Sequence, residues 1–350
     1  MKKKLLLVLI VILWVAAAAA IFWAMNDKKE ESDEQEEVEG PAVPEETAEK
    51  FLAPFTGMES EQEFTHRPVM AVINNHPAAR PQTGLVEADI VFEFLAEGDV
   101  TRFLALYQSE FPDEVGPIRS ARDYFVNMAD SYDAFFVAHG YSPDAKMLLD
   151  AGVVEHINGM AYDGTLFQRS TDRVAPHNSY ISFDNILTGM ETVGAGLTDD
   201  SESAYHFYDN TESAKLMEQA SSVEIAYGSN PMFQNVYTYD ETSHQYSRAS
   251  GGILTGDKES LEMMEVSNVL FFETAHNPID SKGRLAIDLT SGGNALIFQG
   301  GGRLEAQWTV ENGMLVPISN GEPVKLAPGK TWIHIVPENP GLDEMVSSTP

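Results

Sequence analysis

The sequence predicts an α/β fold, α+β overall: an N-terminal α/β layered domain followed by a β-rich C-terminal domain, behind one N-terminal transmembrane helix. Three observations support this prediction. An uncharged apolar stretch opens the chain, short apolar runs alternate with helix signals up to about residue 198, and turn-separated strand patterns follow from about residue 222. The 350 residues are enough for one large or two ordinary domains behind such a helix.

The first element is a predicted membrane anchor at residues 1–25. Lys2–Lys4 precede the apolar stretch Leu5–Met25, whose 21 residues contain no charge. At about 1.5 Å per residue a helix of this length reaches roughly 31 Å, close to the hydrocarbon thickness of a bilayer. The lysines favour the cytoplasmic side, so the bulk of the chain is expected outside a single-pass cell-membrane anchor. A signal peptide cleaved near Ala16–Ala20 is the alternative, although its apolar region is usually only about 7–15 residues long.

Residues 26–50 form a predicted disordered linker. They include 11 acidic and 3 basic residues and few apolar ones. Such a segment cannot bury enough apolar surface to fold alone, and like charges extend it. The linker is therefore expected to hold the folded region away from the membrane.

Residues 51–198 carry the pattern of an α/β domain. Four short apolar runs predict buried strands at 69–73, 90–95, 103–107 and 134–138. Ser120 is a candidate cap for a helix that ends near Asp130. Ser142 followed by proline and aspartate predicts a second helix that ends near Gly152.

A connector at 199–221, with a helix over Thr211–Ala220, leads to the predicted β-rich domain at 222–337. A hairpin is expected from 236–239 and 245–248, because turn residues separate the two runs. Glycine-rich or proline-containing turns separate further predicted strands at 285–289, 295–298, 305–310 and 332–336. Residues 338–350 are expected to be a loose tail.

Composition excludes several classes of function. The chain has no cysteine, which removes disulfides, thiol nucleophiles and cysteine-bound zinc. Its net charge of −32 disfavours nucleic acid as a partner. The acidic residues fit a solvated surface; a cation-binding surface is the alternative, but no loop has EF-hand spacing. The nine histidines show no metal-ligand spacing, no cofactor is indicated, and no standard catalytic signature is present.

Arginine is the most informative residue type. From Arg67 to Arg173 the chain has seven arginines and one lysine. The planar guanidinium matches carboxylate and phosphate oxygens in two-point contact, which predicts an anion-binding pocket. The candidate residues are Asn75, His76, Arg80, Arg102, Arg119, Arg122, His139, Arg169, Arg173, His177 and Asn178. The alternative is that these arginines form structural ion pairs with neighbours such as Asp89, Glu93 and Asp123.

Several strings resemble the YerB-like family of bacterial envelope proteins, a domain-of-unknown-function family. They include RPVMAVINNHPAARPQTGL, VGPIRSARDYF, YDAFFVAHGYSPDA and APHNSY, with weaker matches such as GRLAIDLTSGGNALIFQGG near the C-terminus. The resemblance covers about residues 60–337. It implies an envelope location and a shared fold, but no established activity. Family members are thought of as lipoproteins with a lipidated cysteine, whereas this chain has an apolar stretch and no cysteine.

Two functions follow from these patterns. The first is a non-catalytic envelope protein that binds an anionic cell-wall or lipid-linked ligand, or an envelope partner, through the arginines. The second is an enzyme acting on phosphorylated cell-wall polymer precursors, with Asp89, Glu93, His139 or His177 as base. Only the enzyme requires a carboxylate or imidazole within hydrogen-bond reach of the arginine-lined cavity.

Overall fold

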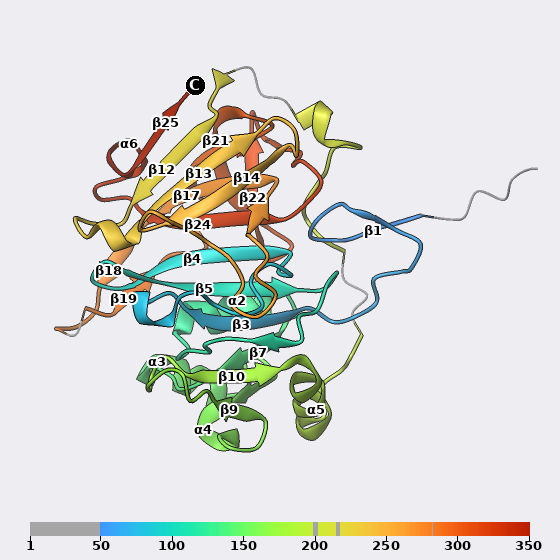
Figure 1. Ribbon diagram of the computed structural model, residues 1–350, viewed down its shortest axis with the longest axis vertical. Helices are drawn as coiled ribbons and strands as arrows, with labels where there is room; N and C mark the ends of the chain where they lie inside the picture. Colours follow the sequence, from blue (N-terminus) through green and yellow to red (C-terminus); the bar gives the residue numbers. More distant parts are fainter. Residues whose placement is uncertain (1–49, 199–201, 215–217, 282) are drawn as a thin grey trace, which may run out of the picture. The chain divides into compact units, whose positions relative to one another are not determined.

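The computed structural model describes residues 50–198, 202–214, 218–281 and 283–350 (Figure 1). The predicted anchor and residues 26–49 of the predicted linker lie outside these ranges. No helix in the described ranges is long and apolar enough to cross a membrane.

One mixed sheet runs through both predicted domains in the order β23-β22-β21-β20-β17-β24-β4-β5-β3-β7-β8. The first domain supplies β3 (Val69–Asn74), β4 (Ile90–Glu97), β5 (Val100–Tyr107), β7 (Phe135–Ala138) and β8 (His156–Asn158). The second domain supplies β17 (Asn268–Thr274), β20 (Gly293–Gln299), β21 (Gly302–Glu311), β22 (Met314–Ser319), β23 (Glu322–Pro323) and β24 (Thr331–Pro337). The two sets join where β24 pairs in parallel with β4.

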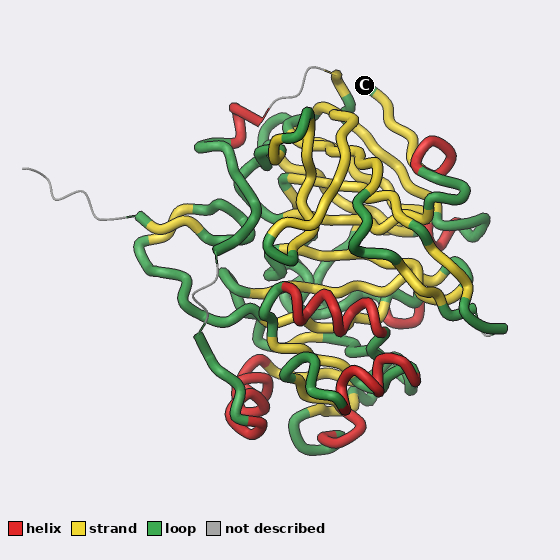
Figure 2. Tube along the Cα trace, turned by 180° about the vertical axis from the view of Figure 1, so that it is seen from behind, coloured by secondary structure: helices red, strands yellow, loops and turns green. Residues whose placement is uncertain are grey.

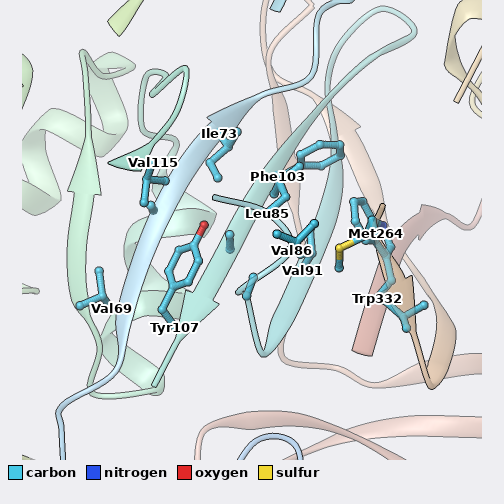
Figure 3. Close-up of a cluster of buried hydrophobic side chains, with 14 of the residues drawn as sticks. Val69, Ile73, Leu85, Val86, Val91, Phe103, Tyr107, Val115, Met264 and Trp332 are labelled. Carbon is cyan, nitrogen blue, oxygen red and sulfur yellow. The ribbon is translucent and has the colours of Figure 1, made fainter. Parts of the chain in front are cut away.

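A second sheet packs against one face of the first. Its main path is β15-β14-β13-β12-β25, and β16 also pairs with β14. The strands are β12 (Ser222–Ala226), β13 (Gln234–Asp240), β14 (Gln245–Ser250), β15 (Ile253–Leu254), β16 (Glu265–Val266) and β25 (Val346–Thr349). Side chains from this sheet, such as Tyr237 and Val223, share a core with Phe103 and Trp332 of the large sheet. The rings of Phe103 and Trp332 lie 5.0 Å apart, and Figure 3 shows both among other residues of this core.

Helices cover both faces of the first-domain strands (Figure 2). They are α2 (Asp123–Ser131), α3 (Pro143–Asp150), α4 (Gly159–Tyr162) and α5 (Phe183–Val193). Phe125 of α2 packs in one core with Met70 and Val72, whereas Ile186 of α5 packs in the other core with Ala71 and Ile73. The side chains of β3 therefore alternate between two buried layers, which explains its uninterrupted apolar sequence.

Shorter elements complete the fold. Two-stranded pairs are formed by β1 (Phe51–Leu52) with β2 (Glu59–Ser60) and by β18 (His276–Pro278) with β19 (Leu285–Ile287). A small sheet contains β6 (Glu114–Val115), β9 (Phe167–Arg169) and β10 (Ser179–Ser182). The remaining elements are the 3-10 turns η1 (Pro77–Ala79), η2 (Thr211–Ala214) and η3 (Pro231–Phe233), with β11 (Glu218–Gln219) and α6 (Leu342–Met345).

The four predicted first-domain strands and the two predicted helices are present, and the Ser142 hydroxyl accepts the Ala145 N–H as the N-cap of α3. Ser120 does not cap α2. Arg122 occupies that position, because residues 119–121 are extended: the Arg119 N–H donates to Val72 and the Ala121 N–H to Gly140.

Two segments of the second half differ from the expectation. In the described parts of the predicted helix Thr211–Ala220, Thr211–Ala214 form η2 and Glu218–Gln219 form β11, which pairs with the first residues of β21. Residues 338–350 are not a loose tail, since α6 and β25 lie there and β25 pairs with β12. In both cases a strand edge elsewhere in the chain supplies the hydrogen bonds, which local sequence patterns do not report.

Candidate functional site

Three parallel strands of the first domain end at one edge of the large sheet. Strand β3 pairs in parallel with β7, and β7 with β8. Asn75 and His76 follow β3, residues 139–142 follow β7, and Gly159 follows β8. Ligands of open α/β sheets bind beyond the carboxyl ends of such strands. Polar residues singled out in the sequence therefore gather at the edge where a ligand would be expected.

An arginine pocket of about 320 Å³ lies at this edge, and four arginines line it. Arg102 comes from β5, Arg119 and Arg122 from the loop before α2, and Arg284 from the turn between β18 and β19. Glu97, at the end of β4, also lines the pocket. The structure thus brings together three of the predicted arginines and adds one from the second domain.

The loop that carries Arg119 and Arg122 is held close to the strand ends. The Ser120 hydroxyl donates to the His139 carbonyl, and the Ala121 N–H donates to the Gly140 carbonyl. A Cβ at Gly140 would lie 2.6 Å from the Ser120 oxygen, and its φ of +94° is unfavourable for other residues. Glycine at this position therefore allows the two loops to meet and places the arginines beside β7.

Glu97 accepts from two of the arginines. Nη2 of Arg102 lies 3.1 Å from both of its carboxylate oxygens, and Arg122 donates to one of them. Burial alone would raise the pKa of Glu97, but the two guanidinium groups outweigh it and hold that pKa below its usual value. Burial, with repulsion from Arg122, lowers the pKa of Arg102 to about 10, so it is charged at neutral pH.

Arg119 differs from the other three arginines. Arg284 is paired with Asp280 at 2.6 Å and lies 3.8 Å from Asp144, so it has carboxylate partners. Within the described residues, Arg119 has no side-chain hydrogen bond or ion pair, and its Nε is buried without a partner. The pocket thus contains a guanidinium whose charge no described carboxylate contacts.

The predicted histidines form separate arrangements beside the pocket. His76 and His177 stack with ring centroids 4.6 Å apart. Nδ1 of His76 accepts from the Ala78 N–H at 3.1 Å, and Nδ1 of His177 accepts from Asn74 at 2.8 Å. Burial, with repulsion from the nearby His76, Arg119 and Arg173, lowers the pKa of His177.

His139 is held between a serine and an arginine. Its Nδ1 lies 2.7 Å from the Ser179 hydroxyl and its Nε2 lies 2.8 Å from Nη2 of Arg169. Arg169 also pairs with Asp163 at 2.9 Å and donates to Asn178 at 3.2 Å. Since arginine only donates, Nε2 accepts and Nδ1 donates to Ser179. This tautomer cannot take the serine proton, so the pair does not form an activated nucleophile.

The remaining predicted residues lie outside the arginine pocket. Arg80 donates to Asn75 Oδ1 at 3.0 Å and to the Met232 carbonyl at 2.7 Å, and lines a different groove with Asn75. Arg173 donates to the backbone carbonyls of Ala79 and Pro81, both at 2.6 Å. These two arginines hold the loop between β3 and β4 through amide and backbone carbonyl oxygens, and not through the ion pairs that the sequence offered as the structural alternative.

Comparison with known proteins decides the family. The sequence matches "Protein of unknown function (DUF3048) N-terminal domain" over residues 55–196 and the corresponding C-terminal domain over residues 223–333. The chain belongs to the DUF3048 family. A relative of this DUF3048 protein, the putative lipoprotein YerB of Bacillus subtilis, is 45% identical over 299 residues, which cover 85% of this chain and 89% of the relative.

A solved structure agrees with this assignment. The crystal structure of YerB from Bacillus subtilis is similar with a TM-score of 0.79 and 43% identity, covering 86% of this DUF3048 chain and 100% of that one. The resemblance to YerB-like proteins is thereby confirmed. The matched proteins support an envelope-type protein from a family of unknown function.

The sequence did not point to two of the charged residues that line the pocket, Glu97 and Arg284. Arg284 lies in the C-terminal half of this DUF3048 chain, more than 160 residues after Arg119. No local pattern joins the two arginines, because they are brought together by long-range contacts such as the pairing of β24 with β4. Glu97 carried a weak signal, since it is the last residue of the buried strand β4 and a tight turn follows it.

The carboxylates considered as catalytic bases lie elsewhere. Asp89 accepts the backbone N–H groups of Gln108 and Ser109 at 2.7 and 2.9 Å. Glu93 is fully buried and pairs with Arg248 at 2.9 Å. Neither lines the arginine pocket. Glu97 does, but it is held as a carboxylate by Arg102 and Arg122, and a base with a lowered pKa takes up a proton poorly.

Proposed function

We propose that this DUF3048 protein is a membrane-anchored, extracytoplasmic envelope protein that binds an anionic ligand in the arginine pocket. The supporting observation is Arg119, a guanidinium without a described protein partner beside three other arginines. Leaving a buried donor unpaired costs about 1–3 kcal/mol, and more for a charged group. A phosphate or carboxylate in the pocket would supply the missing acceptor.

The ligand class follows from the geometry of the lining. Several guanidinium groups around one small pocket suit a group with several negative oxygens, such as a phosphate or pyrophosphate. Outside a bacterial membrane, phosphorylated cell-wall or lipid-linked molecules have this chemistry, as does an acidic envelope protein. The net charge of −32 also makes a local excess of arginine unusual on this chain.

The proposed location at the outer side of the cell membrane is based on the sequence of this chain and on the description of its relative YerB. YerB is described as a putative lipoprotein. A lipidated cysteine is absent from this sequence, and Leu5–Met25 is apolar and uncharged. We infer that this stretch takes the place of the lipid and holds the chain on the outer side of the cell membrane, with the acidic residues 26–50 between anchor and domains.

Replacing Arg119 by glutamine should weaken pyrophosphate binding by about 10- to 150-fold, since a charged hydrogen bond contributes roughly 1.5–3 kcal/mol. The measurement is calorimetric titration of the full chain in lipid nanodiscs. Because Arg119 has no described partner to lose, the variant should unfold at no lower temperature than the native chain.

The matched control is Arg303→Gln, which removes the same charge from an arginine paired with Glu218 and Glu305. This variant should bind pyrophosphate like the native chain. Equal losses in both variants would mean that only overall charge matters. Unchanged binding in Arg119→Gln would remove the basis of the proposal.

A further inference from the structure

A second pocket, the apolar groove, lies away from the arginine pocket. Its volume is about 320 Å³, and its walls include Pro81, Met232, Ile253, Leu254, Leu261 and Met263. Four of these side chains are largely open to solvent: Ile253 at 69%, Leu254 at 56%, Leu261 at 72% and Met263 at 53%. Exposed apolar side chains that gather around one hollow indicate a binding surface, unlike apolar residues scattered singly.

One cation at the groove lacks an anionic partner. Arg80 donates from Nε to Asn75 and from Nη1 to the Met232 carbonyl, and it lies over the Phe233 ring at 5.4 Å. Its Nη2 is buried without a hydrogen-bond partner. In the described part of the chain, no carboxylate lies within ion-pair distance of Arg80. The guanidinium is thus a charged donor with unused capacity.

The other charged residues of the groove are already occupied. Arg248 is paired with Glu93 at 2.9 Å. Asp257 accepts the Gly84 N–H with one oxygen at 2.6 Å and the N–H groups of Glu259 and Ser260 with the other, at 2.7 and 2.9 Å. Arg80 therefore remains the charge that a ligand of opposite sign would meet.

We propose that the apolar groove binds a small amphiphile, with its alkyl chain along the apolar walls and one carboxylate or phosphate on Arg80. The volume is at the lower end of the range of about 300–1,000 Å³ typical of small-molecule sites. Met232 and Met263 are flexible enough to adapt to chains of different shape. The groove shares no lining residue with the arginine pocket, so this inference goes beyond the proposed function and does not depend on it.

The test uses dodecanoic acid carrying a photoreactive diazirine, applied to the full chain in lipid nanodiscs and mapped by mass spectrometry. Labelling should fall on peptides containing Met232 or residues 253–263, and unlabelled dodecanoate should compete for it. Val174, which is 77% exposed and outside the groove, is the internal control for non-specific labelling.

Three variants separate the contributions. Arg80→Gln should reduce groove labelling by about tenfold or more, because a charge-assisted hydrogen bond is lost. Leu254→Asp should abolish it while leaving the fold intact, since this side chain is already exposed. Arg119→Gln should leave it unchanged, which keeps the outcome distinct from that of the arginine pocket.

Several results would overturn the proposal. Labelling that does not saturate, or that is equally strong at Val174, would show only non-specific binding. Equal competition by neutral dodecanamide would remove the role of Arg80. A dimer in the native chain that becomes a monomer in Leu254→Asp would assign the groove to a second copy of the chain.

Discussion

Replacing Glu93 by glutamine should lower the free energy of unfolding by about 3–5 kcal/mol, the cost of removing one partner of a buried ion pair. Glu93 is 0% exposed and pairs with Arg248 at 2.9 Å across the boundary between the domains. It also accepts from Trp332 at 3.0 Å and Thr101 at 2.7 Å. Without its charge, Arg248 would remain buried 4.2 Å from the centre of the Trp332 ring with no counter-ion.

The matched control is Lys146→Gln, which breaks the ion pair with Asp150 on α3. Both side chains are well exposed, so solvent screens the pair and only a small loss of stability is expected. Urea unfolding of the native chain and both variants gives the comparison. A small loss in Glu93→Gln, similar to that of Lys146→Gln, would contradict the view that this buried pair secures the joint between the domains.

Acid should destabilise the protein through His334. This side chain is fully buried, and its ring nitrogens hydrogen-bond to the hydroxyls of Tyr227 at 2.8 Å and Tyr237 at 2.7 Å. Burial is the main cause that lowers the pKa of His334 to about 3. The ordinary histidine pKa is about 6.5, so below that pH the unfolded chain binds a proton that the folded chain does not. The stability from this group is therefore complete above pH 6.5 and declines as the pH falls towards 3, by about 3–5 kcal/mol in total.

Asp89 opposes part of this effect. Burial raises its pKa to about 6, so the folded chain takes up this proton first and gains stability as the pH falls from about 6 towards 4. The informative measurement is therefore the difference between the native chain and His334→Gln. Unfolding free energies between pH 7 and 4 should fall less steeply in the variant. Parallel curves for the two proteins would show that His334 does not titrate as described.

The elements that were predicted correctly are those whose signals are local. Val69–Asn74 is a strand because its side chains are buried on both faces, and α3 begins at Pro143 because Ser142 caps it. The prediction of a loose tail at residues 338–350 was wrong because the signal for a strand there is not local. Val346–Thr349 alternates exposed and half-buried residues and becomes a strand only because β12 offers a free edge.

The sequence predicted some of the arginines that line one pocket, but not all of the pocket's charged residues. The density of arginine pointed to an anion site, and Arg102, Arg119 and Arg122 do line one pocket. The sequence could not distinguish these three arginines from Arg173, which donates hydrogen bonds to the backbone of a loop. The two roles differ only in long-range contacts. Arg284 could not be predicted as a pocket residue for the same reason, since it belongs to the other domain.

The most direct test of the arginine pocket is to locate an anion in crystals. Crystals of the protein would be soaked in tungstate, which mimics phosphate and gives a strong anomalous signal. We expect an anomalous peak within hydrogen-bond distance of Arg119, and the same anion should also contact Arg284 of the second domain. An empty pocket in crystals where tungstate occupies other arginines of the chain would contradict it.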